Sequence, residues 1–147
     1  KMRLFIPHFA LLFFLSMKLT GQGIAILEEY QWKNRVVLVF TQAQDQLYQQ
    51  QLNVFNEKHS GMLDRDLLVF TIMPKSVIAP NEKELGAEVA DKLRQKYHTQ
   101  PNEFAVVLIG KDGGQKLKQS SLLSTEKLFG IIDQMPMRRR EMRKKPG

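Results

Sequence analysis

The stretch Phe104–Lys118, FAVVLIGKDGGQKLK, constrains the fold more than any other part of this sequence. Its first six residues, Phe104 to Ile109, are apolar, which is typical of a strand buried on both faces. The Asp-Gly pair and three glycines of Gly110–Gly114 suit the positive φ angles of a tight hairpin turn. Gln115–Lys118 then alternates polar and apolar residues, as an edge strand does. The stretch therefore predicts a hairpin that joins the centre of a sheet to one edge.

A second apolar run, Val36–Phe40, predicts another central strand, followed by a helix. Apolar residues recur at spacings of four and three from Asp45 onward, which indicates one buried helix face. We expect this helix to stop near His59–Gly61, because glycine is the usual residue just past a helix end.

Asp66–Ile72 (DLLVFTI) predicts the second central strand, and two prolines bracket the loop that follows it. Asn81 can cap the next helix, with Glu84 as its third residue, in a variant of the capping box. After the hairpin, Ser124 caps a last helix that Pro136 is expected to end.

These elements occur in the order β-α-β-α-β-β-α. That order matches the thioredoxin-type core, a mixed four-stranded sheet with helices on both faces. We therefore predict an α/β, thioredoxin-like fold, in a single domain over residues 24–137.

The N-terminal segment, residues 1–23, has the pattern of a signal peptide. Two of its first three residues are basic, Leu4–Met17 is largely apolar, and small residues follow at Gly21, Gly23 and Ala25. The apolar run is shorter than the ~20 residues of a membrane-spanning helix. We expect cleavage after Gly23 or Ala25, secretion, and no membrane span.

The basic charge is concentrated at the C-terminus. Residues 24–137 hold 13 Lys/Arg against 14 Asp/Glu, whereas residues 138–147 hold six Lys/Arg against one Glu. This tail is interpreted either as a solvated terminus or as a polyanion site. Outside the cell the polyanion would be a sulfated glycosaminoglycan, and nucleic acid is expected only if the signal peptide is misassigned. The candidate glycan-binding residues are Arg138, Arg139, Arg140, Arg143, Lys144 and Lys145.

The sequence contains no cysteine, which excludes thiol nucleophiles and thiolate metal sites on this chain. Thioredoxin-type enzymes hold a reactive thiol where the first strand meets the first helix. Here that junction contains Thr41, which has no neighbouring base in sequence and is best interpreted as a cap or connector. His59 and His98 lie near predicted helix ends, where they can bond the last carbonyls. We predict no catalytic residue, no metal and no cofactor.

Four stretches together resemble a known family. They are Trp32–Val36, Asp64–Leu67, Gly110–Gly114 with Lys116–Leu117, and Ile132–Arg139 with Glu141–Arg143. The pattern resembles the domain of unknown function shared by sushi-repeat-containing secreted proteins and the matrix protein coiled-coil domain-containing protein 80. The resemblance covers residues 25–143. It implies a secreted thioredoxin-like domain with extracellular-matrix or cell-adhesion roles and heparin-type glycans as partners.

The Met-Pro-Met-Arg-Arg segment belongs to this family pattern, so Arg138 and Arg139 can be structural, which leaves Arg140, Lys144 and Lys145 less constrained. We predict a non-catalytic binding module that associates with the extracellular matrix or cell surface through sulfated glycans. One alternative is a protein–protein interaction domain without glycan binding. The other is an enzyme with a non-thiol site near Thr41.

Overall fold

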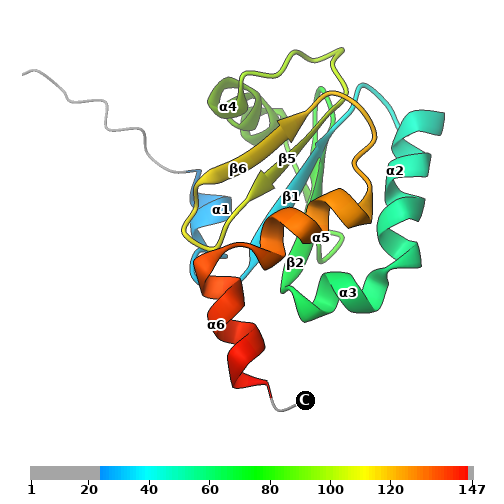
Figure 1. Ribbon diagram of the computed structural model, residues 1–147. Helices are drawn as coiled ribbons and strands as arrows, with labels where there is room; N and C mark the ends of the chain where they lie inside the picture. The colour runs from blue at the N-terminus through cyan, green and yellow to red at the C-terminus, as the bar shows by residue number, and fades with distance from the viewer. Residues whose placement is uncertain (1–23, 146–147) are drawn as a thin grey trace, which may run out of the picture.

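A mixed six-stranded sheet forms the centre of the computed structural model, which describes residues 24–145 (Figure 1). Its strand order is β4-β3-β2-β1-β5-β6. The three central strands are β1 (Arg35–Phe40), β2 (Leu67–Ile72) and β5 (Ala105–Ile109). β1 pairs in parallel with β2 and antiparallel with β5. The predicted thioredoxin-like α/β fold is confirmed.

The predicted hairpin is also present. β6 (Gln115–Gln119) pairs antiparallel with β5, and Gly113 takes the positive φ of 82° in the turn between them. At the opposite edge, β3 (Val77–Ile78) and β4 (Glu84–Leu85) add two strands to the four that were predicted. These strands have two residues each, too few to show a periodic pattern in the sequence.

The first long helix, α2 (Gln46–Glu57), begins where the sequence predicts, with the Asp45 carboxylate accepting from Tyr48 N at 3.0 Å. It ends at Glu57, close to the predicted stop near His59–Gly61, but another helix, α3 (His59–Asp64), follows it directly. Gly61 lies inside α3, where a Cβ atom would come within 2.7 Å of the Phe129 ring. The glycine permits close packing of α3 against α5 (Thr125–Asp133) and does not end a helix.

The predicted start of the next helix at Asn81 is wrong. α4 (Ala87–Tyr97) begins after Gly86, because the residues before it pair as β4. The Asn81 side chain instead accepts from Lys83 N at 3.2 Å in the preceding turn. His98 ends α4 in the left-handed region, with φ 52°.

The chain ends in two helices where one was predicted. Ser124 caps α5 as predicted, accepting from Lys127 N at 3.2 Å. Pro136 does not end that helix but is the first residue of another, α6 (Pro136–Lys144). Proline suits a first helical turn, where its missing N–H would have no intrahelical partner. The basic segment is thus largely helical.

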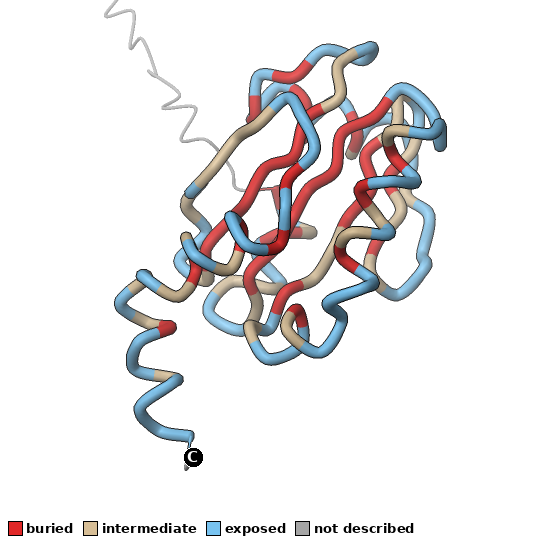
Figure 2. The backbone as a smooth tube through the Cα atoms, turned by 45° about the vertical axis from the view of Figure 1, so that its right-hand side comes forward, coloured by how far each residue is buried: buried red, intermediate tan, exposed pale blue. Residues whose placement is uncertain are grey.

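The core lies on both faces of the sheet, as the unbroken apolar runs require. Every residue of β1 is buried, and successive side chains point to opposite faces. α4 and the short α1 (Ala25–Glu28) cover one face, while α2, α3 and α5 cover the other. Figure 2 shows the buried strands at the centre and α6 extending from this body with mostly exposed residues. The predicted signal peptide lies outside the described residues.

Candidate functional site

Thr41 lies at the end of β1 where thioredoxin-type enzymes carry a reactive thiol. Its side chain is 1% exposed, and its hydroxyl donates to Ala43 O at 2.7 Å. Its backbone N–H donates to Ile72 O at 3.0 Å. A buried hydroxyl bonded to a carbonyl has neither access to substrate nor a base to activate it. The structure therefore removes the basis for a Thr41 nucleophile.

Arg138 is the first of the six predicted glycan-binding residues, and it faces inward. It is 3% exposed, and its Nη1 donates to Asp64 O at 2.8 Å. Its Nε lies 3.1 Å from Asp133 Oδ1, and its Nη2 pairs with the Asp64 carboxylate. Lys145 also pairs with Asp64. These two basic residues bind the protein's own acids.

Glu141, the only acid of the C-terminal segment, joins α6 to the start of β1. Its carboxylate makes two bonds to the Arg35 guanidinium, at 3.1 and 3.2 Å, and Arg35 is 1% exposed. Lys111 Nζ lies 2.8 Å from Glu141 Oε1 and 2.7 Å from Asp66 Oδ2. Buried cations such as Arg35 need partners of this kind.

Arg65 completes the network. It makes two bonds to Asp133, at 3.0 and 2.7 Å, and its guanidinium lies 4.0 Å from the centre of the Phe129 ring. We call the whole set the ion cluster: Arg35, Asp64, Arg65, Asp66, Lys111, Asp133, Arg138, Glu141 and Lys145.

The cluster lowers the pKa of three of its carboxylates, those of Asp64, Asp133 and Glu141. Hydrogen bonds from Lys145 and Arg138 lower the pKa of Asp64 to about 2. Burial raises the pKa of Asp133, but hydrogen bonds from Arg65 and Arg138 outweigh it and the net shift is downward. The same balance lowers the pKa of Glu141, with Lys111 and Arg35 as donors. These acids are therefore charged at neutral pH.

The four stretches that carry the family resemblance each contribute to this cluster. Arg35 begins β1, Asp64–Asp66 precede β2, Lys111 follows β5, and the last stretch supplies Asp133 and α6. The cluster thus lies at the end of the sheet opposite Thr41. The motifs are visible in the sequence, but only the structure shows that they lie together in the ion cluster.

The remaining four candidates lie on the outward side of α6. All are exposed, and none forms an ion pair within residues 24–145. At ~100° per residue, the inward residues Arg138 and Glu141 share one side of α6, and Lys145, just past its end, pairs with Asp64 as Arg138 does. The other side forms what we call the outward face: Arg139, Arg140, Arg143 and Lys144.

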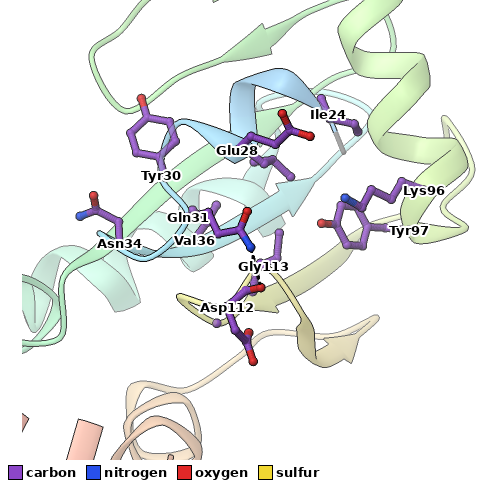
Figure 3. Close-up of a pocket in the computed structure, with 13 residues that line it drawn as sticks. Ile24, Glu28, Tyr30, Gln31, Asn34, Val36, Lys96, Tyr97, Asp112 and Gly113 are labelled. Carbon is purple, nitrogen blue, oxygen red and sulfur yellow. Dashed lines mark hydrogen bonds between the residues drawn. The ribbon is translucent and has the colours of Figure 1, made fainter. Parts of the chain in front are cut away.

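A separate pocket of about 210 Å³ lies between α1, the end of α4 and the β5–β6 turn (Figure 3). Gln31 crosses it and donates to Asp112 O at 3.0 Å. Tyr97 borders it with a buried hydroxyl that has no partner among the described residues, and burial raises its pKa to about 12. Nothing in the sequence indicates this pocket, because Tyr97 fits the apolar periodicity of α4 as an ordinary core residue.

Residues 24–145 contain neither a cluster of metal ligands nor a membrane-spanning helix. No group of three or more His, Cys, Asp or Glu side chains is arranged to hold a metal ion. No helix in this part of the chain is long and apolar enough to cross a bilayer.

A family model described as "Domain of unknown function (DUF4174)" matches residues 26–141. The chain belongs to this family. Similar proteins include sushi repeat-containing protein SRPX of Rattus norvegicus, 29% identical over 122 residues, and coiled-coil domain-containing protein 80 of Danio rerio, 28% identical over 133 residues. The matches cover 80% and 79% of this chain but 26% and 15% of those proteins. The resemblance inferred from the four stretches is confirmed.

Solved structures show that this DUF4174 domain shares the fold of thiol peroxidases. A reduced 2-Cys peroxiredoxin of Plasmodium vivax superimposes with a TM-score of 0.59, over 78% of this chain and 84% of that one. Thioredoxin peroxidase I of Plasmodium yoelii gives 0.58, over 82% of both chains. Each is 14% identical, so the likeness concerns the fold alone. The DUF4174 domain has no cysteine with which to perform such chemistry.

Proposed function

We propose that this protein is a secreted, non-catalytic binding module that holds a sulfated glycosaminoglycan on the outward face of α6. Secretion is supported by the signal-peptide pattern of residues 1–23 and by the family resemblance. The absence of cysteine and the buried, bonded hydroxyl of Thr41 support a role in binding.

The observation that carries the proposal is the division of charge across one helix. The ion cluster neutralises the inward side of α6 and fixes its position, while four exposed cations occupy the other side. A fixed array of cations binds a polyanion at a lower entropic cost than a frayed terminus would. The rest of the domain carries nearly balanced charge, so the outward face is the main positively charged surface that can attract sulfate groups.

Heparin-affinity chromatography tests this proposal. The test variant replaces all four outward-face cations with glutamine, and it should elute at clearly lower salt than the unmodified protein. The control carries the same charge change at exposed lysines elsewhere in the domain: Lys58, Lys75, Lys83 and Lys92. The control should elute near the unmodified protein. If both variants elute at equally lowered salt concentrations, heparin binds the net charge of the protein and not the outward face, and the proposed site is rejected.

Truncation after Met137 is a poorer test. It removes Arg138 and Glu141 along with the outward face, and it leaves the buried guanidinium of Arg35 without its carboxylate partner. A loss of binding could then follow from unfolding.

A protein partner is the second candidate, and one residue favours it. Trp32 is 62% exposed and takes a φ of 67°, with its backbone N–H donating to Lys111 O at 2.6 Å. Exposed tryptophans are enriched among residues that dominate protein interfaces. Binding at Trp32 would depend little on salt and would be lost in Trp32→Ala, whereas binding at the outward face would survive that change.

A further inference from the structure

Arg94 is a buried cation that the protein itself leaves largely unbonded. It lies on the inner side of α4, is 5% exposed, and forms no ion pair in residues 24–145. Its Nη2 makes one long bond, 3.5 Å, to Ile72 O. Its Nε and Nη1 are buried and have no acceptor among the described residues. A guanidinium has five N–H donors, so most of its bonding capacity is unused.

A pocket of about 400 Å³ borders Arg94. Asp91 and Gln95 line it from α4, together with His98 and the residues 99–101 that follow the helix. Thr99 is 4% exposed, and its hydroxyl is also buried without a partner in the described chain. Two side chains that carry buried, unbonded polar atoms thus line the same pocket.

Among residues 24–145, no carboxylate near the pocket forms an ion pair with Arg94, so its charge is available to an anion. Burial lowers the pKa of Arg94, and the nearby Asp91 carboxylate raises it only in part. Asp91 is itself exposed. On the loop side, Lys118 Nζ donates to His98 O at 2.7 Å and lies 3.8 Å from Glu103 Oε1. None of the carboxylates named here pairs with Arg94.

The position of the pocket separates it from α6. Ile72 O, which accepts from Arg94, also accepts from Thr41 N at 3.0 Å. Arg94 therefore reaches the end of the sheet that carries the reactive group in thiol enzymes of this fold, opposite the ion cluster.

We infer that this pocket binds a small molecule through an oxyanion group, a carboxylate or a sulfate, that is held by Arg94 and Thr99. A guanidinium binds such groups through charge-assisted hydrogen bonds, and the Thr99 hydroxyl supplies another donor. The volume exceeds the needs of a single ion and accommodates an organic acid of several carbon atoms.

NMR titration of the ¹⁵N-labelled protein tests this inference, with succinate and sulfate as separate probes and chloride holding the ionic strength constant. We expect saturable shifts of the amides of residues 91–100 with at least one probe, and the probe that binds more tightly identifies the anion. The same shifts should occur when the outward face of α6 is neutralised, since the two sites lie at opposite ends of the sheet. An absence of saturable shifts, or shifts confined to α6, would overturn the inference.

Two substitutions at Arg94 complete the test. Arg94→Met preserves the apolar stem and removes a buried charge, so the variant should remain folded and lose the response to both probes. Arg94→Lys keeps the positive charge but lacks the planar, paired N–H donors of a guanidinium. This variant should bind the probe anion at least ~10-fold more weakly. Unchanged binding in Arg94→Met would overturn the inference. Because the titration of the unmodified protein is decisive by itself, a variant that unfolds does not leave the question open.

Discussion

Arg35 and Glu141 are 106 positions apart in the chain, yet the guanidinium of one meets the carboxylate of the other in two bonds, at 3.1 and 3.2 Å. The pair joins the first residue of β1 to the middle of α6, and Lys111 contacts the same carboxylate. A helix whose residues are mostly exposed is thereby fixed to the sheet. The ordered position of the outward face depends on this pairing.

We therefore expect Glu141→Gln to destabilise the protein by about 2–3 kcal/mol, because it leaves the buried Arg35 charge without its carboxylate. Urea unfolding measures this change. Glu88→Gln is the control, since it breaks an exposed pair with Lys92 on α4 and should leave the free energy of unfolding almost unchanged. Equal effects of the two substitutions would contradict a structural role for the ion cluster.

The second prediction concerns acid. The pKa of Asp64 is lowered to about 2, below the ordinary value of 3.8, so its pairs stabilise the fold above about pH 4 and lose this effect as the pH falls toward 2. The side chain is 42% exposed, so solvent screening reduces the contribution to about 1 kcal/mol. Asp64→Asn should therefore be less stable than the unmodified protein at pH 7 and nearly equal to it at pH 2.

Urea unfolding at a series of pH values measures that difference. Glu57→Gln on α2, which removes a carboxylate that forms no ion pair in the described chain, provides the baseline. If the difference in free energy of unfolding between Asp64→Asn and the unmodified protein stays constant down to pH 2, the destabilisation at neutral pH comes from packing and not from the ion pairs.

The third prediction compares two helical glycines. Gly61→Ala brings a Cβ to within 2.7 Å of Phe129, a ring that also stacks on Arg65, so we expect a loss of about 1–3 kcal/mol. Gly130→Ala on α5 meets nothing within 4 Å and should stabilise the protein by up to about 1 kcal/mol through helix propensity. Thermal unfolding of both variants measures these changes in stability. If Gly61→Ala stabilised the protein, α3 and α5 would not be in close contact.

The sequence predicted the core of this fold because the signals were local. The apolar runs, the Asp-Gly turn and the cap Ser124 each act within a few residues, and all were found where expected. Gly61 and Pro136 were misassigned because glycine ends many helices but also permits close packing, and proline both follows helices and begins them. Only the position of Phe129 in space distinguishes the two roles of Gly61.

The site was harder to predict than the fold. The family pattern set Arg138 and Arg139 apart from the other basic residues of the tail, but the two that contact Asp64, more than 70 positions away, are Arg138 and Lys145. No periodicity within α6 reveals the partners of its charges. Arg94 and Thr99 were equally hidden, since each occupies an unremarkable position in a helix or turn and only tertiary burial makes its missing partners significant.

The salt dependence of heparin binding tests the central claim most directly. The affinity of the purified protein for a labelled heparin oligosaccharide is measured by fluorescence anisotropy between about 50 and 200 mM salt. If all four outward-face cations contact sulfates, a plot of log affinity against log salt should have a slope of about −3, as for other polyanions. The variant with all four replaced by glutamine should lose most of that slope, while the variant changed at four other lysines keeps it. Equal slopes for the two variants would contradict the account.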